Sequence, residues 1–115
     1  MSEKHKQILL KGNAAIAAGN HEGFLSLCSD DTEWNFIGVQ TLKGKQAVRE
    51  WMNETYKEPP QVTVTNLIAD GDYLTAIGEV TMKDENDKPQ LDAYCDVWRF
   101  RDDLLVELRA FVIKI

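Results

Sequence analysis

The chain has 115 residues, of which 43% are hydrophobic and 28% charged, and we expect it to form one domain that spans residues 1–115. Its nineteen acidic and thirteen basic residues give a net charge of −6. This balance argues against nucleic acids and anionic membranes as partners, because both bind basic surfaces. Residues 1–20 lack the pattern of a signal peptide, and no apolar run is long enough to cross a membrane. We therefore expect a cytoplasmic protein.

The first half of the chain has mainly helical periodicity. Gly19 followed by Asn20 is typical of a helix stop and the cap of the next helix, and Pro59 is typical of a helix end. Ser29, Asp30 and Asp31 are interpreted as a break after the second helix. The expected elements are helices over residues 3–18 and 20–28, a short strand over 33–37, a loop over 38–44 and a third helix from residue 45.

From residue 61 onward the apolar period changes to two, which predicts strands. The expected strands cover residues 61–69, 73–82, a segment that carries Asp96, and 104–113. Helices followed by a meandering sheet indicate an α+β fold, in which three N-terminal helices pack on a strongly curved, cone-shaped antiparallel sheet. Such curvature would leave a cavity for a small apolar or aromatic molecule.

One predicted strand places a carboxyl group among aromatic rings. Side chains alternate along a strand, so Tyr94, Asp96, Trp98 and Phe100 share one face. If that face is buried, desolvation favours the protonated form of Asp96, which can then donate a hydrogen bond. Alternatively, Asp96 is a structural group that accepts hydrogen bonds from a nearby ring, or it lies on a solvated edge strand.

The sequence contains no motif for a metal or a cofactor, and we expect neither. His5 and His21 are the only imidazoles, and their spacing matches no metal motif. Cys28 and Cys95 lie far apart in the chain, so we expect two reduced thiols. These features exclude zinc sites and Ser-His-Asp triads from the candidate chemistries.

Three segments carry a family resemblance: AAGN at 17–20, GKQAVREW at 44–51 and DVWRF at 96–100. With the order of the elements, they resemble the NTF2-like superfamily, and in particular its SnoaL-like and ketosteroid-isomerase-like branches. In ketosteroid isomerases one aspartate is the general base, and a tyrosine and a protonated aspartate form the oxyanion hole. The resemblance places the protonated acid on Asp96. It places the base on Asn35, which cannot take a proton, and the oxyanion tyrosine near Gly12. The acid implied for the SnoaL-like branch falls where this chain has Val112 and Ile113.

The resemblance implies a protein with a small-molecule pocket and an isomerase-, cyclase- or lyase-like activity. Asp96 would act as acid or oxyanion donor on a carbonyl or phenolic oxygen, and Asn35 would donate a second hydrogen bond. The expected lining residues are Trp34, Met52, Tyr56 and Trp98. Two alternatives remain open, a binder without turnover and a protein-interaction module.

The last predicted strand has two unlike faces. Leu104, Val106, Leu108, Ala110 and Val112 form an all-apolar register, which we expect to face the helices. Leu105, Phe111 and Ile113 share the other face with Glu107 and Arg109. This mixed face predicts a homodimer that forms through the sheet.

Overall fold

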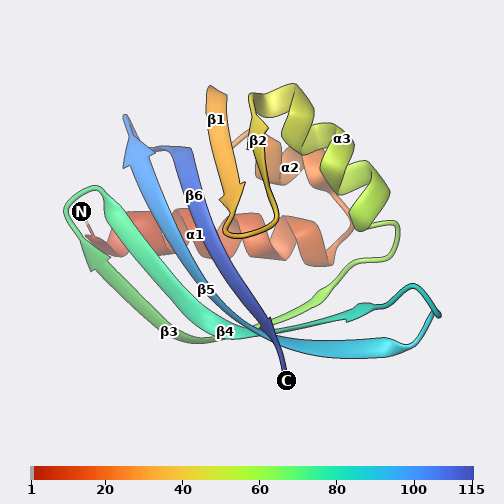
Figure 1. Ribbon diagram of the computed structural model, residues 1–115. Helices are drawn as coiled ribbons and strands as arrows, with labels where there is room; N and C mark the ends of the chain where they lie inside the picture. The colour runs from red at the N-terminus through yellow and green to blue at the C-terminus, as the bar shows by residue number, and fades with distance from the viewer. Residues whose placement is uncertain (1) are drawn as a thin grey trace.

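The computed structural model describes residues 2–115, and within them three helices cover one face of a six-stranded sheet (Figure 1). This confirms the α+β class. The elements in chain order are α1 (Ser2–Ala17), α2 (His21–Leu25), β1 (Cys28–Phe36), β2 (Gln40–Lys43), α3 (Lys45–Thr55), β3 (Gln61–Asp70), β4 (Tyr73–Lys83), β5 (Pro89–Arg101) and β6 (Leu104–Lys114). No helix in this part of the chain is long and apolar enough to span a membrane.

The sheet differs from the expected antiparallel meander. Its strand order is β2-β1-β6-β5-β4-β3, and β1 pairs with β6 in parallel while all other pairs are antiparallel. Two strands precede α3, so the helices are not all N-terminal, and the sheet is not strongly curled. The parallel pairing of β1 with β6 is long-range, and local periodicity does not reveal it.

The polar segment after α2 is a strand rather than a helix break. The helix α2 ends at Leu25, and β1 already begins at Cys28. Asp30 and Asp31 are exposed on this strand and form ion pairs with Lys45 at 3.4 Å and Arg101 at 2.8 Å. The arginine holds the pKa of the Asp31 carboxyl below its usual range. Polar residues that face solvent hid the strand from the sequence pattern.

Residues 40–43 form the short edge strand β2, where the sequence predicted only a loop. They pair with the end of β1, from Glu33 opposite Lys43 to Phe36 opposite Gln40. Of the four residues only Leu42 is even partly buried. A short, solvated edge strand of this kind carries almost no apolar periodicity, so its sequence pattern does not predict a strand.

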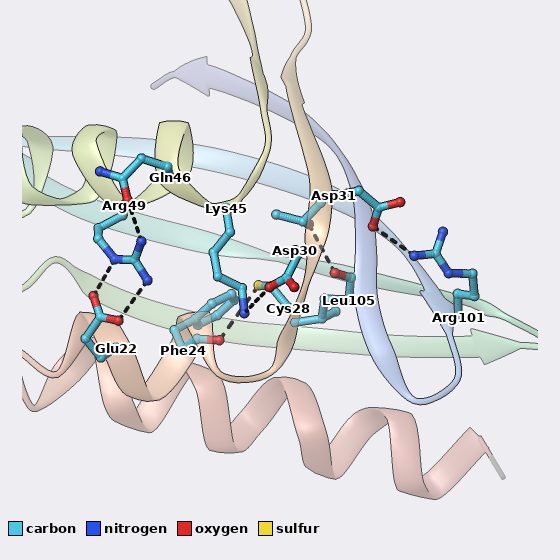
Figure 2. A network of polar contacts seen from close by, with 11 residues as sticks. Glu22, Phe24, Cys28, Asp30, Asp31, Lys45, Gln46, Arg49, Arg101 and Leu105 are labelled. Carbon is cyan, nitrogen blue, oxygen red and sulfur yellow. Dashed lines mark hydrogen bonds and ion pairs between the residues drawn. The ribbon is translucent and has the colours of Figure 1, made fainter.

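Ion pairs hold α3 beside α2 and β1 (Figure 2). Arg49 donates from Nε and Nη2 to the two carboxylate oxygens of Glu22, at 2.8 and 3.0 Å. The arginine accordingly lowers the pKa of Glu22. Exposed ion pairs stabilise a fold little, but this two-point contact fixes the orientation of α3, whose inner face supplies cavity residues.

A β-bulge between β5 and β6 changes which residues of the last strand are buried. Arg99 lies opposite Glu107, but Phe100 lies opposite Leu105, so Val106 is the extra residue. Leu105 is fully buried, and its predicted place on the mixed outer face is wrong for that reason. Beyond the bulge the prediction holds, because Leu108, Ala110 and Val112 line the space under the helices while Phe111 and Ile113 are exposed.

Gly78 allows two strands and a side chain to meet at one point. The register of β3 against β4 shifts between Val64 and Asn66, and the carbonyl of Thr63 comes directly over the Cα of Gly78. The Tyr94 hydroxyl donates to the same carbonyl at 3.2 Å. A Cβ at position 78 would overlap the Thr63 carbonyl oxygen, so only glycine fits there.

Candidate functional site

A cavity of about 320 Å³ lies between the helices and the sheet, within the size range of small-molecule sites. Its lining is mostly apolar and aromatic. The lining residues include Asn13 from α1, Trp34 and Phe36 from β1, Trp51, Met52 and Tyr56 from α3 and its end, and Asp92, Tyr94, Asp96 and Trp98 from β5. The cavity therefore collects side chains from segments that are far apart in the sequence.

The structure places Asp96 as the strand alternation predicts. Tyr94, Asp96 and Trp98 all line the cavity, and Tyr94 and Trp98 are 8% and 4% exposed. The residues directly opposite Asp96 on the neighbouring strands are Ala76 and Ala110. These small side chains leave open space on both sides of the carboxyl group, which is how a cavity can exist beside it.

The Asp96 carboxyl has no hydrogen bond or ion pair with any other residue of the described range 2–115. Burial raises its pKa to about 7. Burial, together with the charge of Asp96, also raises the pKa of Tyr94 to about 12 and the pKa of Tyr56 above its usual value. At neutral pH Asp96 therefore exists in both protonation states and can donate or accept a proton.

Aromatic rings form a continuous wall beside this carboxyl. Trp34 lies 5.4 Å from Trp98 and 6.1 Å from Trp51, measured between ring centroids. Trp51 in turn lies 4.8 Å from Phe36 and 5.0 Å from Tyr56. All four predicted lining residues, Trp34, Met52, Tyr56 and Trp98, lie on the cavity.

The structure does not bring Asn35 to Asp96. Trp34 and Phe36 point into the cavity, so Asn35 between them points to the other face of β1, where its Oδ1 accepts a hydrogen bond from Thr41 Oγ1 at 3.2 Å. Its expected pairing with Asp96 is therefore wrong. Side-chain alternation along the predicted strand 33–37 already indicates that Asn35 points away from the face that carries Trp34 and Phe36. Glu79 on β4 is exposed and is not among the cavity residues, so its carboxylate does not lie beside Asp96 as a base either.

Sequence reasoning missed three polar residues of the cavity, Asn13, Gln40 and Asp92, and the first and last of them lie on the inner faces of their elements. Asn13 lies four residues after Leu9 and three before Ile16, both of which are buried, so helical spacing places it on the inner face of α1. Asp92 lies four residues before Asp96 and thus on the same face of β5. For Asn13 and Asp92 the spacing along the helix or strand indicates the cavity face, but the aromatic residues were the more conspicuous candidates.

Helices over one face of a mixed sheet, with an apolar cavity between the two layers, define the NTF2-like class of fold. A family model, the SnoaL-like domain, matches residues 11–108 of the chain. The protein therefore belongs to the SnoaL-like family. A comparison with curated proteins gave no match.

Solved structures support the same class. An NTF2-like protein of unknown function from Cytophaga hutchinsonii is 26% identical, with a TM-score of 0.79 over 98% of this chain and 99% of that one. The epoxide hydrolase/cyclase-like enzyme SalBIII, which takes part in pyran ring formation in the polyether salinomycin, has a TM-score of 0.88 at 18% identity, over 96% and 91% of the chains. An LEH-like epoxide hydrolase of Mycobacterium tuberculosis has a TM-score of 0.86 at 12% identity, over 96% and 84%. At such identities the last two show the fold alone.

Proposed function

We propose that the protein binds a small apolar or aromatic molecule in this cavity and acts on it by proton transfer through Asp96. The observation that supports this most directly is a carboxyl group in an apolar cavity that has no partner within the described part of the chain, with its pKa raised to about 7 by burial. A group with that pKa is close to the optimum for exchanging a proton at neutral pH. The oxygen of a ketone or a phenol would be the natural partner of its acid form.

Tyr56 supplies the second polar group of the proposed site, in place of Asn35. Its phenol lies on the cavity and is close enough to Asp96 for the carboxylate charge to raise its pKa. No hydrogen bond within residues 2–115 occupies the Tyr56 hydroxyl. A phenol and a protonated carboxyl that face the same space could both donate to one oxygen and stabilise negative charge that develops on it.

A binder without turnover is the second candidate. It is favoured by the positions of Asn35 and Glu79, because neither lies on the cavity where it could assist Asp96. The neighbours' activities are compatible with either candidate, since SalBIII is described as an epoxide hydrolase/cyclase-like enzyme while the protein from C. hutchinsonii has no known function. Binding and proton transfer must therefore be measured separately.

The test uses 3-tert-butylphenol for binding, by titration calorimetry, and 2-tetralone for proton transfer, by loss of its α-proton NMR signals in D₂O. The wild type is expected to bind the phenol and to accelerate exchange of the tetralone. Asp96→Asn keeps a hydrogen-bond donor but cannot exchange a proton with the ligand, so we expect exchange to fall by at least about a hundredfold while the phenol still binds.

Glu79→Gln is the matched control, because it removes an exposed carboxylate from β4 and should leave both readouts unchanged. Binding without any acceleration of exchange would support the second candidate and contradict catalysis. If neither compound binds, the proposed function of the cavity is contradicted altogether.

We also propose that two copies associate through the outer face of the sheet. Ile77, Cys95 and Phe111 lie opposite one another on β4, β5 and β6, and the next row consists of Glu79, Ala93 and Ile113. Ile77, Phe111 and Ile113 are 37%, 42% and 67% exposed. An exposed apolar patch of this kind is typical of a protein-protein contact.

Phe111→Glu is expected to shift the protein from dimer to monomer, because it places a charge in the centre of the proposed contact. Analytical ultracentrifugation at several concentrations measures the change. Leu10→Glu is the control, since Leu10 is similarly exposed, at 39%, but belongs to α1. A monomeric wild type, or a dimer that tolerates glutamate at position 111, would contradict this interface.

A further inference from the structure

The charged groups of the cavity all have one sign. Two carboxyl groups, Asp92 and Asp96, line it, and the remaining titratable groups there are the phenols of Tyr56 and Tyr94. None of the described residues that line the cavity is a lysine, an arginine or a histidine. Because the whole chain also carries a net charge of −6, the field in the cavity is negative. An anionic ligand such as a carboxylate, sulfonate or phosphate would meet no compensating charge.

The walls of the cavity add a second preference for positive charge. Seven of the lining residues are aromatic: Phe24, Trp34, Phe36, Trp51, Tyr56, Tyr94 and Trp98. The face of an aromatic ring carries negative potential and attracts a cation, and tryptophan does so most strongly. Groups of such rings at steep angles form the cages that bind quaternary ammonium ions.

The rings around Trp51 stand at such angles. Trp51 meets Trp34 at an interplanar angle of 68° and Tyr56 at 73°, so the three rings do not form a flat stack. Trp51, Tyr56 and Phe36 are only partly buried and line the cavity, so each has surface that a ligand can reach. Asp92 and Asp96 lie on β5 in the same cavity, four residues apart and thus separated by about 13 Å along the strand.

We propose that the ligand of this cavity is an organic cation, an aromatic or apolar amine or ammonium compound whose positive group packs against the ring wall around Trp51. Its charge is balanced by the two carboxyl groups, of which Asp96 has no hydrogen-bond or ion-pair partner among residues 2–115. This inference rests on the proposed function in one respect, because it takes the cavity to be a ligand site. It adds the charge of the ligand, which neither the fold nor the family specifies.

Two isosteric probes test the charge alone. 3-Hydroxyphenyltrimethylammonium and 3-tert-butylphenol have nearly the same shape and the same phenol, but only the first is charged. In calorimetric titrations at pH 7.5 and low ionic strength, we expect the ammonium compound to bind the wild type at least about tenfold more tightly, the effect of one desolvated cation–π contact of 1–2 kcal/mol. The anion 3-hydroxybenzenesulfonate is expected not to bind.

Two variants test which residues cause the preference for the ammonium compound. Trp51→Leu removes the central ring of the wall, and Asp92→Asn removes one of the two charges without changing its size. Each is expected to reduce the ratio of the ammonium affinity to the tert-butylphenol affinity by about threefold or more. The ratio is independent of a general loss of binding through partial misfolding, and thermal unfolding of each variant checks that it is folded.

The outcomes separate this inference from the proposed function. If tert-butylphenol binds as tightly as the ammonium compound or more tightly, the cationic ligand is ruled out while the cavity remains a ligand site. If the sulfonate binds as tightly as the ammonium compound, the inference also fails, because the field would not be negative. Absence of binding by all three probes overturns both proposals together.

Discussion

The Asp96 carboxyl is expected to contribute a loss of stability as the pH rises from about 4 to about 7, and Asp96→Asn is expected to remove that contribution. The pKa of Asp96 is about 7 in the folded state, because of burial, and about 4 in the unfolded chain. Between these values the folded state holds the proton more tightly than the unfolded state does. Raising the pH therefore favours unfolding, by at most about 1.4 kcal/mol per pH unit for this one group.

Chemical denaturation at pH 4, 5.5, 7 and 8.5 measures this effect as the difference between the variant and the wild type. Asp96→Asn should become the more stable of the two above pH 7. Between pH 4 and that range, its free energy of unfolding should gain on the order of 2–4 kcal/mol over that of the wild type. Glu79→Gln is a suitable control because its carboxylate is exposed. If the difference between Asp96→Asn and the wild type does not change with pH, the carboxyl is solvated in the folded state, and its proposed role as a proton donor fails with it.

Gly78→Ala is expected to destabilise the fold by roughly 3 kcal/mol or more, although it adds a single methyl group. The new Cβ would overlap the backbone carbonyl of Thr63, and a backbone atom in a paired strand cannot move away cheaply. Relief would require β3 to separate from β4, which would also break the hydrogen bond from the Tyr94 hydroxyl to Thr63.

Glu79→Ala tests the same strand one residue further on, where the side chain is exposed, and should change the stability by less than about 0.5 kcal/mol. Urea unfolding of both variants makes the comparison. A Gly78→Ala protein as stable as Glu79→Ala would mean that β3 does not approach β4 as closely as described. The position of Tyr94 beside Asp96 would then need revision as well.

The sequence predicted the part of the site that depends on one strand. Alternation along β5 was enough to put Asp96 on the cavity with Tyr94 and Trp98, because both faces of a strand follow from its local pattern. The position of Asn35 was predicted wrongly because that prediction did not use the alternation along its strand. Its role was carried over from the family resemblance, whereas its own strand pattern pointed it away from the cavity.

The fold, like the site, was predictable only where it follows from the local pattern of a single element. The α+β class and the strands after residue 61 follow from local periodicity. The predicted strand 33–37 covers the second half of β1. The first half was hidden by Asp30 and Asp31, which face solvent and form ion pairs, and β2 was hidden because its residues are mostly exposed. The bulge at Val106, which buries Leu105, depends on how two strands meet and has no counterpart in the sequence pattern of either strand alone.

The position of β6 in the sheet has a consequence for how the protein folds. This strand is the last in chain order, yet it lies between β1 and β5, and it joins the hairpin of β1 and β2 to the rest of the sheet (Figure 1). Its pairing of Leu105 with Cys28 closes a loop of most of the chain, a contact of the kind that slows folding. Trp34 on β1 and Asp96 on β5 are joined within the sheet only through β6, so the wall that they share is complete only when β6 pairs with both strands.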